Sequence, residues 1–233
     1  MFHSRTECAV TARDGDKATL VADFEAQPGR GQEWACRALD VAIALLALAV
    51  LAPLLAVVAA LVWLQDGGSP FYCDPRMGVG AKRFNCFKFR SMRLDARERL
   101  EAILATDEAA RQEWQRNQKL RNDPRVTPLG RWLRISSFDE VPQLLNVLRG
   151  EMSLVGPRPI NASEIARYGD RFHYYCMVRP GITGLSQVSG RSNLAYAERI
   201  RLDTEYVRRR SLDLNLLILI KTVPAVLFAR GSC

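Results

Sequence analysis

The stretch SSFDEVPQLLNVLRGEMSLVGPRP, residues 136–159, decides how the rest of this chain is interpreted. Two adjacent carboxylates, Asp139 and Glu140, precede a short apolar pattern of helical period, which ends at Gly150. Pro142 restricts where that helix begins, because a residue without an amide hydrogen fits only in the first turn. The sequence therefore predicts that both carboxylates lie at or beside the N-terminus of a short helix.

The acidic pair has two interpretations. Asp139 is either a helix cap, which is a frequent role of Asp at such a position, or part of a functional site. Gly-Pro-Arg-Pro at residues 156–159 is a stiff, non-helical run that presents one guanidinium, which favours a site. The arginines near the pair in the sequence are Arg131, Arg134, Arg149 and Arg158. Carboxylates among fixed arginines suit a site for phosphate and a divalent cation, since the cation offsets the repulsion between carboxylate and phosphate.

The composition favours an anionic partner. Of the 233 residues, 33 are Lys or Arg and 25 are Asp or Glu, which gives a formal net charge of +8. Such a balance is typical of proteins that bind nucleic acid, an anionic membrane surface or a phosphorylated substrate, and composition does not choose among these. The six cysteines contain no CxxC pair and no zinc-like spacing, so we expect reduced thiols in a protein that faces the cytosol.

Residues 41–64 carry no charge and form the strongest single pattern in the sequence. The run is long enough to cross a bilayer, for which about 20 residues suffice, and long for a core helix of a soluble protein. Pro53 divides it in the middle, and basic residues flank both sides, which places both flanks in the cytoplasm by the positive-inside bias. We therefore expect a re-entrant helix that enters and leaves by the same face, with a kinked transmembrane span as the alternative.

The sequence divides into three parts. Residues 1–33 mix charges with Gly and Ala without a sustained period, and we expect a poorly ordered N-terminal tail there. Residues 34–66 form the predicted re-entrant membrane helix. Residues 67–233 form the predicted cytoplasmic catalytic domain with interfacial helices.

Within the third part, residues 84–92 alternate aromatic and basic side chains, which predicts a short strand with one solvated face. Lys88 and Arg90 would project together from that face. Residues 95–120 follow the pattern of one amphipathic helix with a solvated face of mixed charge. Two further helical patterns cover residues 194–210 and 214–228.

Several segments together form a specific pattern. They are KFRSM (88–92), NDPRVT (122–127), LRISSFDEVPQLLNVLRGEMSLVGPRP (133–159), RPGITG (179–184) and QVSGR (187–191). With these segments the chain resembles, over about residues 34–230, the bacterial sugar transferases that start polysaccharide assembly, the monotopic polyprenyl-phosphate phosphoglycosyl transferases. The ending KTVPAVLFARGS and the EW…KL…DPRVT spacing are most similar to the exopolysaccharide-initiating galactosyl-1-phosphate transferases.

The resemblance implies a mainly α-helical protein with a few short strands, held on the cytoplasmic face of the bacterial inner membrane by an N-terminal re-entrant helix. The implied reaction moves a sugar-1-phosphate from a UDP-sugar, UDP-galactose first and UDP-glucose second, to polyprenyl phosphate. It releases UMP and passes through a covalent aspartyl phospho-sugar. Mg²⁺ is the implied cofactor, and the UDP-sugar, polyprenyl phosphate and inner-membrane lipid are the implied partners. No nucleic acid is expected, and a homodimer is compatible with the sequence.

The resemblance also implies roles for single residues. Asp139 would be the nucleophile and a magnesium ligand, with Glu140 as its catalytic partner. The residues implied in substrate binding are Lys88, Arg90, Arg134, Arg158, Arg179, Gln187 and Arg191. Pro53 would break the membrane helix. The chain departs from the family pattern at Ala52, where a serine usually precedes the proline, and at Ser186, where relatives often carry a bulky aromatic.

Two other classes of protein remain open. A nucleic-acid-binding protein would account for the positive charge but not for the apolar run at residues 41–64. A membrane-anchored adaptor without catalysis would account for the apolar run but not for an acidic pair among arginines. The residues favour catalysis, because an acyl phosphate on a carboxylate divides one difficult displacement into two easier steps.

Overall fold

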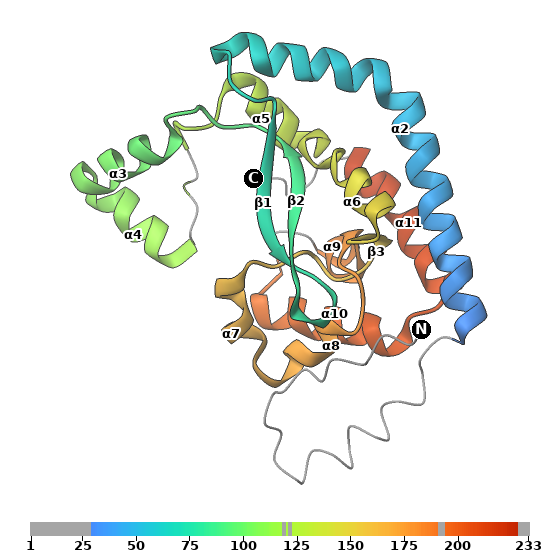
Figure 1. The fold of residues 1–233 in the computed structure, drawn as a ribbon. Coiled ribbons are helices and arrows are strands. Elements are labelled where there is room, and N and C mark those ends of the chain that lie inside the picture. The colour runs from blue at the N-terminus through green and yellow to red at the C-terminus, as the bar shows by residue number, and fades with distance from the viewer. Residues whose placement is uncertain (1–28, 118–119, 121–122, 191–193, 228–233) are drawn as a thin grey trace.

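The fold is mainly helical, with two small two-stranded sheets among the described residues (Figure 1). The computed structural model describes residues 29–117, 120, 123–190 and 194–227. The helices are α2 (Arg30–Asp66), α3 (Ala96–Thr106), α4 (Glu108–Asn117), α5 (Pro128–Ile135), α6 (Gln143–Arg149), α7 (Ile165–Tyr168), α8 (Phe172–Cys176), α9 (Leu185–Ser189), α10 (Tyr196–Arg209) and α11 (Leu212–Leu227). The strands are β1 (Phe71–Met77), β2 (Arg83–Phe89), β3 (Ser153–Val155) and β4 (Gly181–Thr183). The predicted class, mainly helical with a few short strands, is confirmed.

Helix α2 is one long helix that bends into two arms (Figure 1). Pro53 lies inside it, and a proline there removes one hydrogen bond of the helix and presses its ring against the preceding turn, which accounts for the bend. The predicted break at Pro53 is therefore a bend within a continuous helix. Helix α2 also includes residues 30–33, which the sequence assigned to the tail; residues 1–28 of that tail lie outside the described part of the chain.

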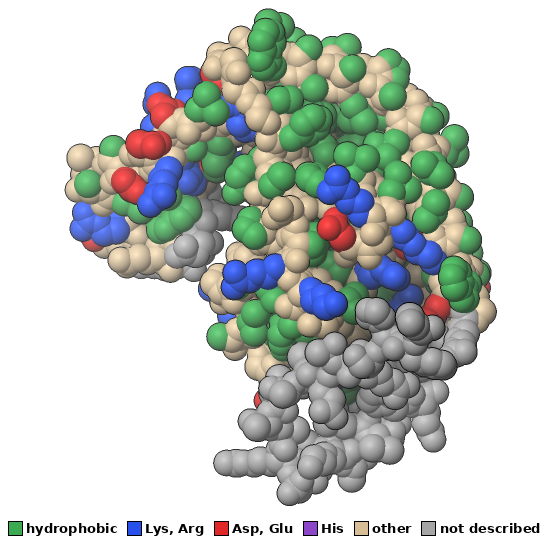
Figure 2. All heavy atoms as spheres, viewed as in Figure 1, with side chains coloured by type: hydrophobic (Ala, Val, Ile, Leu, Met, Phe, Trp, Pro, Cys, Tyr) green, Lys and Arg blue, Asp and Glu red, His purple; other side chains and the backbone are tan. Residues whose placement is uncertain are grey.

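The length and composition of α2 suit a membrane. In the described part of the chain it is the one helix long and apolar enough to cross a bilayer, with a mean hydropathy of 3.0 over an 18-residue window of which only 11% is buried. Hydrophobic side chains cover the outer edge of the molecule where α2 lies (Figure 2). Exposed side chains on α2 include Leu45, Leu46, Val50, Val57, Trp63 and Leu64. The core helix of a soluble protein would bury these side chains, so α2 is compatible with membrane association.

Strands β1 and β2 form an antiparallel hairpin in which Phe71 pairs with Phe89 and Met77 with Arg83. The strand predicted at residues 84–92 is thereby confirmed, although it ends at Phe89. The second arm of α2 packs on this hairpin and on α5 through Val58, Val62, Phe89 and Leu133, a cluster of buried apolar side chains. The hairpin therefore connects the proposed membrane helix to the rest of the domain.

The single helix predicted at residues 95–120 is wrong. The structure has two helices, α3 and α4, which extend together at one side of the molecule (Figure 1). Asp107 lies between them in extended conformation, and its side chain accepts a hydrogen bond from the N–H of Ala110 in the first turn of α4, at 3.0 Å. Aspartate competes with the helical backbone in this way and prefers helix starts, which explains the interruption.

Residues 128–149 fold as two short helices, α5 and α6, joined by a tight turn that contains the acidic pair. The hydroxyl of Thr127 caps α5, and the chain leaves that helix through Ser137, which takes a left-handed conformation with a φ of 57°. The 3-10 turn Phe138–Glu140 follows and leads into α6. Pro142 directly precedes α6, and Gly150 ends it in the left-handed conformation. The predicted position of the two carboxylates, beside the start of a short helix, is therefore confirmed.

Strands β3 and β4 pair in parallel, with Ser153 opposite Gly181 and Val155 opposite Thr183. The largest buried cluster contains residues of β3 and of α2, α6, α10 and α11. Tyr206 of α10 is buried in it, and its hydroxyl donates to the carbonyl oxygen of Val155 at 3.0 Å. The core therefore fixes β3, whose end continues directly into Gly-Pro-Arg-Pro.

Candidate active site

The structure brings the acidic pair to the end of strand β2. Lys88 of β2 donates from Nζ to Oε1 of Glu140 at 3.0 Å, and these two side chains and that of Asp139 are half-buried. Asp139 lies close enough to Glu140, Lys88 and Arg134 for each to act on its charge. Two segments 52 residues apart in the sequence therefore meet at the carboxylates.

The two carboxyl groups have different electrostatic surroundings. Burial, together with the negative charge of Glu140, raises the pKa of Asp139 from 3.8 to about 6, against the opposing effect of Lys88 and Arg134. Burial also acts on Glu140, but the cations Lys88 and Arg158 hold the pKa of Glu140 below its usual value. Both groups are therefore ionised at neutral pH, and Asp139 is the more basic carboxylate.

Asp139 does not cap a helix. Ser137 precedes the 3-10 turn and Pro142 precedes α6, and neither cap position carries a side-chain hydrogen bond. The left-handed Ser137 turns the chain sharply just before the pair. A non-glycine residue in that conformation costs roughly 1–3 kcal/mol and is concentrated at functional sites, where the surrounding structure holds it. The capping interpretation is therefore not supported, and the geometry favours a functional site.

Two arginines approach the pair from different elements. Arg134, in the last turn of α5, donates from Nε to Oγ of Ser91 at 2.9 Å and acts on the charge of Asp139. Arg158 follows β3, is exposed, and lowers the pKa of Glu140. Together with the lysine on β2, these arginines place three cations around two carboxylates. Such a site can accept an anionic substrate beside an anionic nucleophile.

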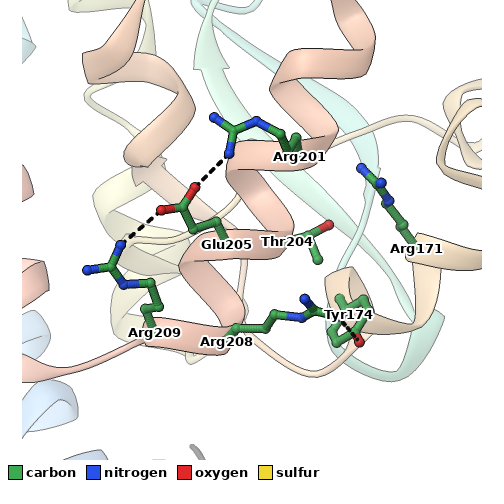
Figure 3. Close-up of a pocket in the computed structure, with 7 residues that line it drawn as sticks. All are labelled: Arg171, Tyr174, Arg201, Thr204, Glu205, Arg208 and Arg209. Carbon is green, nitrogen blue, oxygen red and sulfur yellow. Dashed lines mark hydrogen bonds and ion pairs between the residues drawn. The ribbon is translucent and has the colours of Figure 1, made fainter. Parts of the chain in front are cut away.

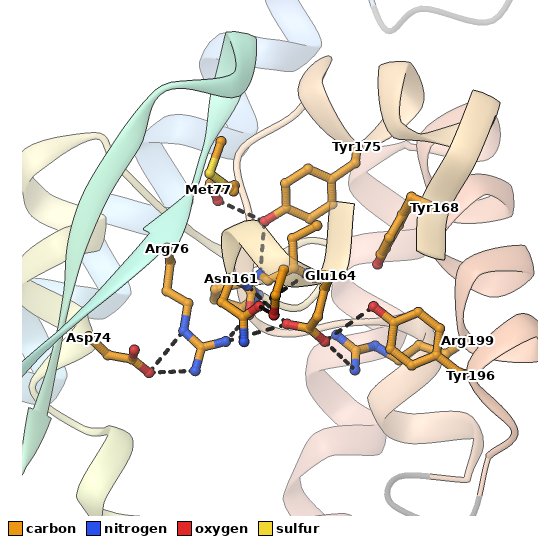
Figure 4. Close-up of polar contacts among 12 residues, drawn as sticks. Asp74, Arg76, Met77, Asn161, Glu164, Tyr168, Tyr175, Tyr196 and Arg199 are labelled. Carbon is orange, nitrogen blue, oxygen red and sulfur yellow. Dashed lines mark hydrogen bonds and ion pairs between the residues drawn. The ribbon is translucent and has the colours of Figure 1, made fainter. Parts of the chain in front are cut away.

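Arg76 is a residue of this region that the sequence did not indicate. From β1 it forms an ion pair with Asp74 and donates from Nη1 to the carbonyl oxygen of Pro159 at 3.0 Å (Figure 4). It also acts on the charge of Glu140. The contact with Pro159 spans 83 residues of sequence, so no local pattern marks it. Arg76 therefore holds the Gly-Pro-Arg-Pro run against the β1–β2 hairpin.

Three glycines let the Gly-Pro-Arg-Pro run (156–159) and the RPGITG loop (179–184) approach each other closely. A Cβ on Gly181 would lie 2.1 Å from the backbone nitrogen of Gly156, and a Cβ on Gly184 would lie 2.1 Å from the carbonyl oxygen of Gly156. No side chain fits at these positions unless the backbone moves. The RPGITG loop therefore supports the run that presents Arg158.

Arg90 does not join the acidic pair. It lies beyond the end of β2, and its Nη1 donates to Oδ2 of Asp66 at 2.9 Å, at the C-terminal end of α2. Lys88 and Arg90, which were predicted to project together, bind different carboxylates: Lys88 pairs with Glu140 and Arg90 with Asp66. Arg90 instead attaches the end of α2 to the hairpin.

The remaining residues implied in substrate binding also lie elsewhere. Arg179 donates from Nε to the carbonyl oxygen of Gly150 at 2.8 Å, just past the end of α6. Gln187 donates to the carbonyl oxygen of Ile182 at 2.8 Å. Arg191 lies outside the described residues. A role of these three residues in binding substrate stays a prediction.

Ser186 is an interior residue. It is buried, and its Oγ donates to Oδ1 of Asp203 at 2.7 Å, while the hydroxyl of Tyr168 donates to the other oxygen of the same carboxylate at 2.8 Å. The departure from the family pattern at this position is thus a polar contact inside the domain.

A surface pocket of about 370 Å³ lies between α8 and α10 (Figure 3). Glu205 accepts hydrogen bonds from Arg201 and Arg209, each at 3.0 Å, and Arg208 donates to the hydroxyl of Tyr174 at 2.8 Å. These are the paired charges of a solvated helix face, and the pocket contains none of the residues around the acidic pair. We therefore place the candidate active site at the pair and not at this pocket.

Comparison with known proteins identifies the family. A family model described as bacterial sugar transferase matches residues 31–229. The chain belongs to the bacterial sugar transferase family. Among its relatives is the exopolysaccharide production protein ExoY of Sinorhizobium fredii, which is 47% identical over 196 residues, 84% of this chain and 87% of the relative. The family expected from the motifs is confirmed.

Two other bacterial sugar transferases carry the name of an activity. The undecaprenyl-phosphate galactose phosphotransferase of Salmonella typhimurium is 44% identical over 206 residues, 87% of this chain and 42% of that protein. The undecaprenyl-phosphate glucose phosphotransferase of Komagataeibacter xylinus is 42% identical over 208 residues, 84% of this chain and 36% of that protein. The chain thus spans less than half the length of these two relatives, and their names support a phosphoglycosyl transferase.

The donor set at the acidic pair of this sugar transferase fits a magnesium ion. In phosphate sites Mg²⁺ is usually held by one or two carboxylates and the phosphates of the substrate, not by a full protein cage. The described residues contain no group of three or more His, Cys, Asp or Glu side chains suited to a metal. Among the same residues no ion pair engages Asp139, whereas Lys88 binds Glu140. Asp139 is therefore the residue that would hold such an ion together with phosphate oxygens.

Proposed function

We propose that this chain is a phosphoglycosyl transferase that moves a sugar-1-phosphate from a UDP-sugar to undecaprenyl phosphate, or another polyprenyl phosphate, and releases UMP. The observation that carries the proposal is the half-buried pair Asp139 and Glu140 beside Lys88, Arg134 and Arg158. The names of the relatives support this substrate class, and the ExoY name supports a role at the start of exopolysaccharide or other surface-glycan synthesis.

The proposed transfer has two steps. In the first, a carboxylate oxygen of Asp139 attacks the phosphorus that carries the sugar, the bond from that phosphorus to the bridging oxygen breaks, and UMP leaves with the electron pair. In the second, a phosphate oxygen of the polyprenyl phosphate attacks the same phosphorus, the acyl-phosphate bond breaks, and the carboxylate of Asp139 is regenerated. Two displacements replace one direct reaction between two anionic substrates.

The residues around the pair support this chemistry through their charges. The raised pKa of Asp139 makes its carboxylate more basic and therefore more nucleophilic, while leaving it ionised at neutral pH. Arg134 and Arg158 offset the charge of the diphosphate, and Glu140 holds Lys88 beside the reacting group. A magnesium ion held by Asp139 would supply further positive charge to the diphosphate when bound.

We extend the proposal to the membrane. The bend of α2 at Pro53 and the basic residues on both of its flanks support a re-entrant helix on the cytoplasmic face of the inner membrane. The helices beside the acidic pair also expose apolar side chains, Trp132 and Ile135 on α5 and Leu145 on α6. Such side chains suit an interfacial surface, where the phosphate of a polyprenyl phosphate lies.

UDP-galactose is the donor we propose, with UDP-glucose second. One relative is named for galactose and another for glucose, and the two sugars differ in the orientation of a single hydroxyl. The assignment rests on resemblance to the galactosyl-1-phosphate transferases. It is independent of the proposed chemistry at the carboxylates.

The proposal is tested by UMP release from a panel of UDP-sugars, with the full chain in lipid nanodiscs containing undecaprenyl phosphate. We expect release from UDP-galactose or UDP-glucose, and a preference for an N-acetylated donor would overturn the donor assignment alone. Asp139→Asn should release no UMP. Glu140→Gln should lose about 100- to 10,000-fold, the range for a residue that positions or transfers a proton. No release by the wild-type protein from any donor would refute the proposed function.

The covalent step has its own experiment. Incubation with a sugar-labelled donor and no acceptor should leave label on the wild-type protein and none on Asp139→Asn. Turnover by Asp139→Asn at the wild-type rate would refute the role of this carboxylate as the nucleophile.

The membrane topology is tested by single cysteines placed in residues 25–33 and near Gly67. Both should resist an impermeant thiol reagent added outside intact cells. Labelling at only one of the two sites would show that α2 crosses the membrane. Pro53→Leu should straighten α2, because proline disfavours a continuous helix by roughly 3 kcal/mol, and should bring one of the two sites outside.

A further inference from the structure

Arg37 of α2 binds the C-terminal end of α6. It donates from Nη1 to the carbonyl oxygen of Val147 at 2.7 Å and from Nη2 to that of Leu148 at 3.1 Å. The last carbonyl groups of a helix have no partner within the helix, and a cation there also complements the helix dipole. Arg179 adds a donor to the carbonyl oxygen of Gly150 at 2.8 Å. Two guanidinium groups therefore fix the end of the helix that follows the acidic pair.

Asp40, one turn further along α2, binds the open edge of β3. Its carboxylate accepts hydrogen bonds from Oγ of Ser153 at 2.7 Å and from the N–H of Leu154 at 3.0 Å. Residues on either side of Leu154 pair with β4, so its N–H points to the other edge of β3, where no strand lies among the described residues. Asp40 takes the place of the missing strand. It is only 7% exposed, and a buried carboxylate is stable only when such hydrogen bonds are made.

These contacts do not form a ligand site. The cavity that Arg37, Asp40 and Arg179 line together has a volume of about 10 Å³, which is at most the space of one water molecule. The charged residues lie directly before the apolar run that begins at Val41. We call Arg37, Asp40 and their partners the α2 joint, since they attach the proposed membrane helix to the domain.

The α2 joint holds two elements that position the residues proposed to react: α6, which follows the acidic pair, and β3, which precedes Arg158. The pair Asp139 and Glu140 precedes α6, whose far end Arg37 holds, and Arg158 follows β3, whose open edge Asp40 holds. The position of Arg158 relative to the carboxylates therefore depends on α6 and β3 keeping their place. Both elements are attached to the same part of α2.

We propose that Arg37 and Asp40 are positioning residues, which fix the acidic pair and Arg158 relative to each other and to the membrane helix. This inference rests on the proposed function. A displacement of about 1 Å between reacting groups can cost about 100-fold in rate. Loosening the α2 joint should therefore lower kcat for UMP release about 10- to 100-fold, with the donor KM changed less than about threefold because the charges that bind the donor remain.

Four variants of the full chain in lipid nanodiscs test the inference. Arg37→Met keeps the side-chain stem and removes both donors, and Asp40→Leu keeps the shape and removes both acceptors; both should lower kcat. Asp40→Asn keeps an oxygen for Leu154 N–H and offers Ser153 a donor, so it should retain kcat within about threefold. Glu33→Gln is the matched control on the same helix, since Glu33 is exposed and lies 3.9 Å from Arg210; it should match the wild type.

Hydrogen–deuterium exchange of residues 146–154 supplies a readout independent of activity. Exchange should be faster in Arg37→Met and Asp40→Leu than in the control. If Asp40→Leu does not fold, Ser153→Ala replaces it, because this change removes one hydrogen bond to Asp40. Exchange and kcat are then compared in Arg37→Met and Ser153→Ala. Unchanged exchange and unchanged kcat in these variants overturn the inference, as does an equal loss of kcat in Glu33→Gln. A third outcome separates the two proposals: the wild type releases no UMP, but residues 146–154 still exchange faster in Arg37→Met and Asp40→Leu than in the control. That result supports the α2 joint and refutes only the proposed function.

Discussion

Replacing Asp139 by Asn should abolish UMP release and, at neutral pH, stabilise the fold. Burial and the charge of Glu140 raise the pKa of Asp139 from 3.8 to about 6, so the folded protein holds its ionised carboxylate at a cost. At about 1.4 kcal/mol per pKa unit, that difference corresponds to about 3 kcal/mol. Because the group is half-buried and partly screened by solvent, we expect about 1–2 kcal/mol. For a chain of this length the gain raises Tm by about 2–8 °C.

The pH dependence gives the sign of the effect. Below about pH 3 the carboxyl group is mostly protonated in both the folded and the unfolded protein, so Asp139 adds almost no cost. Between about pH 4 and 6 the folded protein binds the extra proton, so its free energy of unfolding falls as pH rises through this window. The stabilisation of Asp139→Asn should therefore be full at pH 7.5 and much smaller at pH 4.

Thermal unfolding of the full chain in nanodiscs at both pH values measures this effect. Asp170→Asn is the control, because Asp170 is exposed and lies in a 3-10 turn away from the pair. If Asp139→Asn has the Tm of the wild type at pH 7.5, the ionised carboxylate of Asp139 does not destabilise the folded protein, and the reasoning is refuted. Retained UMP release together with an unchanged Tm would refute both the role of Asp139 as the nucleophile and the cost of its ionised carboxylate.

As the pH is lowered, the rate of UMP release should fall to half near pH 6, because protonation removes the nucleophilic form of Asp139. Lys88→Met should move that midpoint to higher pH, because Lys88 lowers the pKa of Asp139. Initial rates of the two proteins measured across this pH range check both predictions. Gly181→Ala should lower Tm by several degrees, because its Cβ would lie 2.1 Å from the backbone nitrogen of Gly156 and such crowding costs about 1–3 kcal/mol. Gly31→Ala is the control and should not lower Tm, because no atom lies within 4 Å of the added Cβ. Ser137→Val should unfold at a lower temperature than Ser137→Gly, because a φ of 57° strains a branched residue and not glycine; equal Tm values would contradict the strain.

The elements that the sequence predicted well are set by nearby residues. Pro53 within a long apolar run predicts a bent helix, and the alternation before Phe89 predicts β2. Gly150 and Pro142 bound α6, which places the acidic pair correctly. The split at Asp107 carried a local signal as well, since an aspartate in the middle of a helical pattern is a common helix start.

The site could be predicted only in part, because arginine contacts are decided by packing at long range. An arginine side chain is long, and the sequence does not say which carbonyl or carboxylate it reaches. Arg179 lies in a loop that supports the site, yet it turns to the end of α6. Arg90 turns to α2, and Arg76 reaches Pro159 across 83 residues. The sequence pattern predicted a site at the carboxylates, whereas only the fold shows which cations lie near them.

Asp40 has a further consequence for the order in which the protein is made. Its partners Ser153 and Leu154 lie 113 and 114 residues later in the chain, so at about 5–20 residues per second they are synthesised roughly 6–20 s after it. In the topology proposed above, α2 reaches the membrane during that time with a carboxylate that only water solvates, at the edge of its apolar run. A charge at that place resists deeper insertion, because moving it to the bilayer centre costs about 2.5–3.5 kcal/mol. On that proposal, the carboxylate would set the depth of the nascent helix first, and residues 67–233 would later fold onto a helix that already has its place.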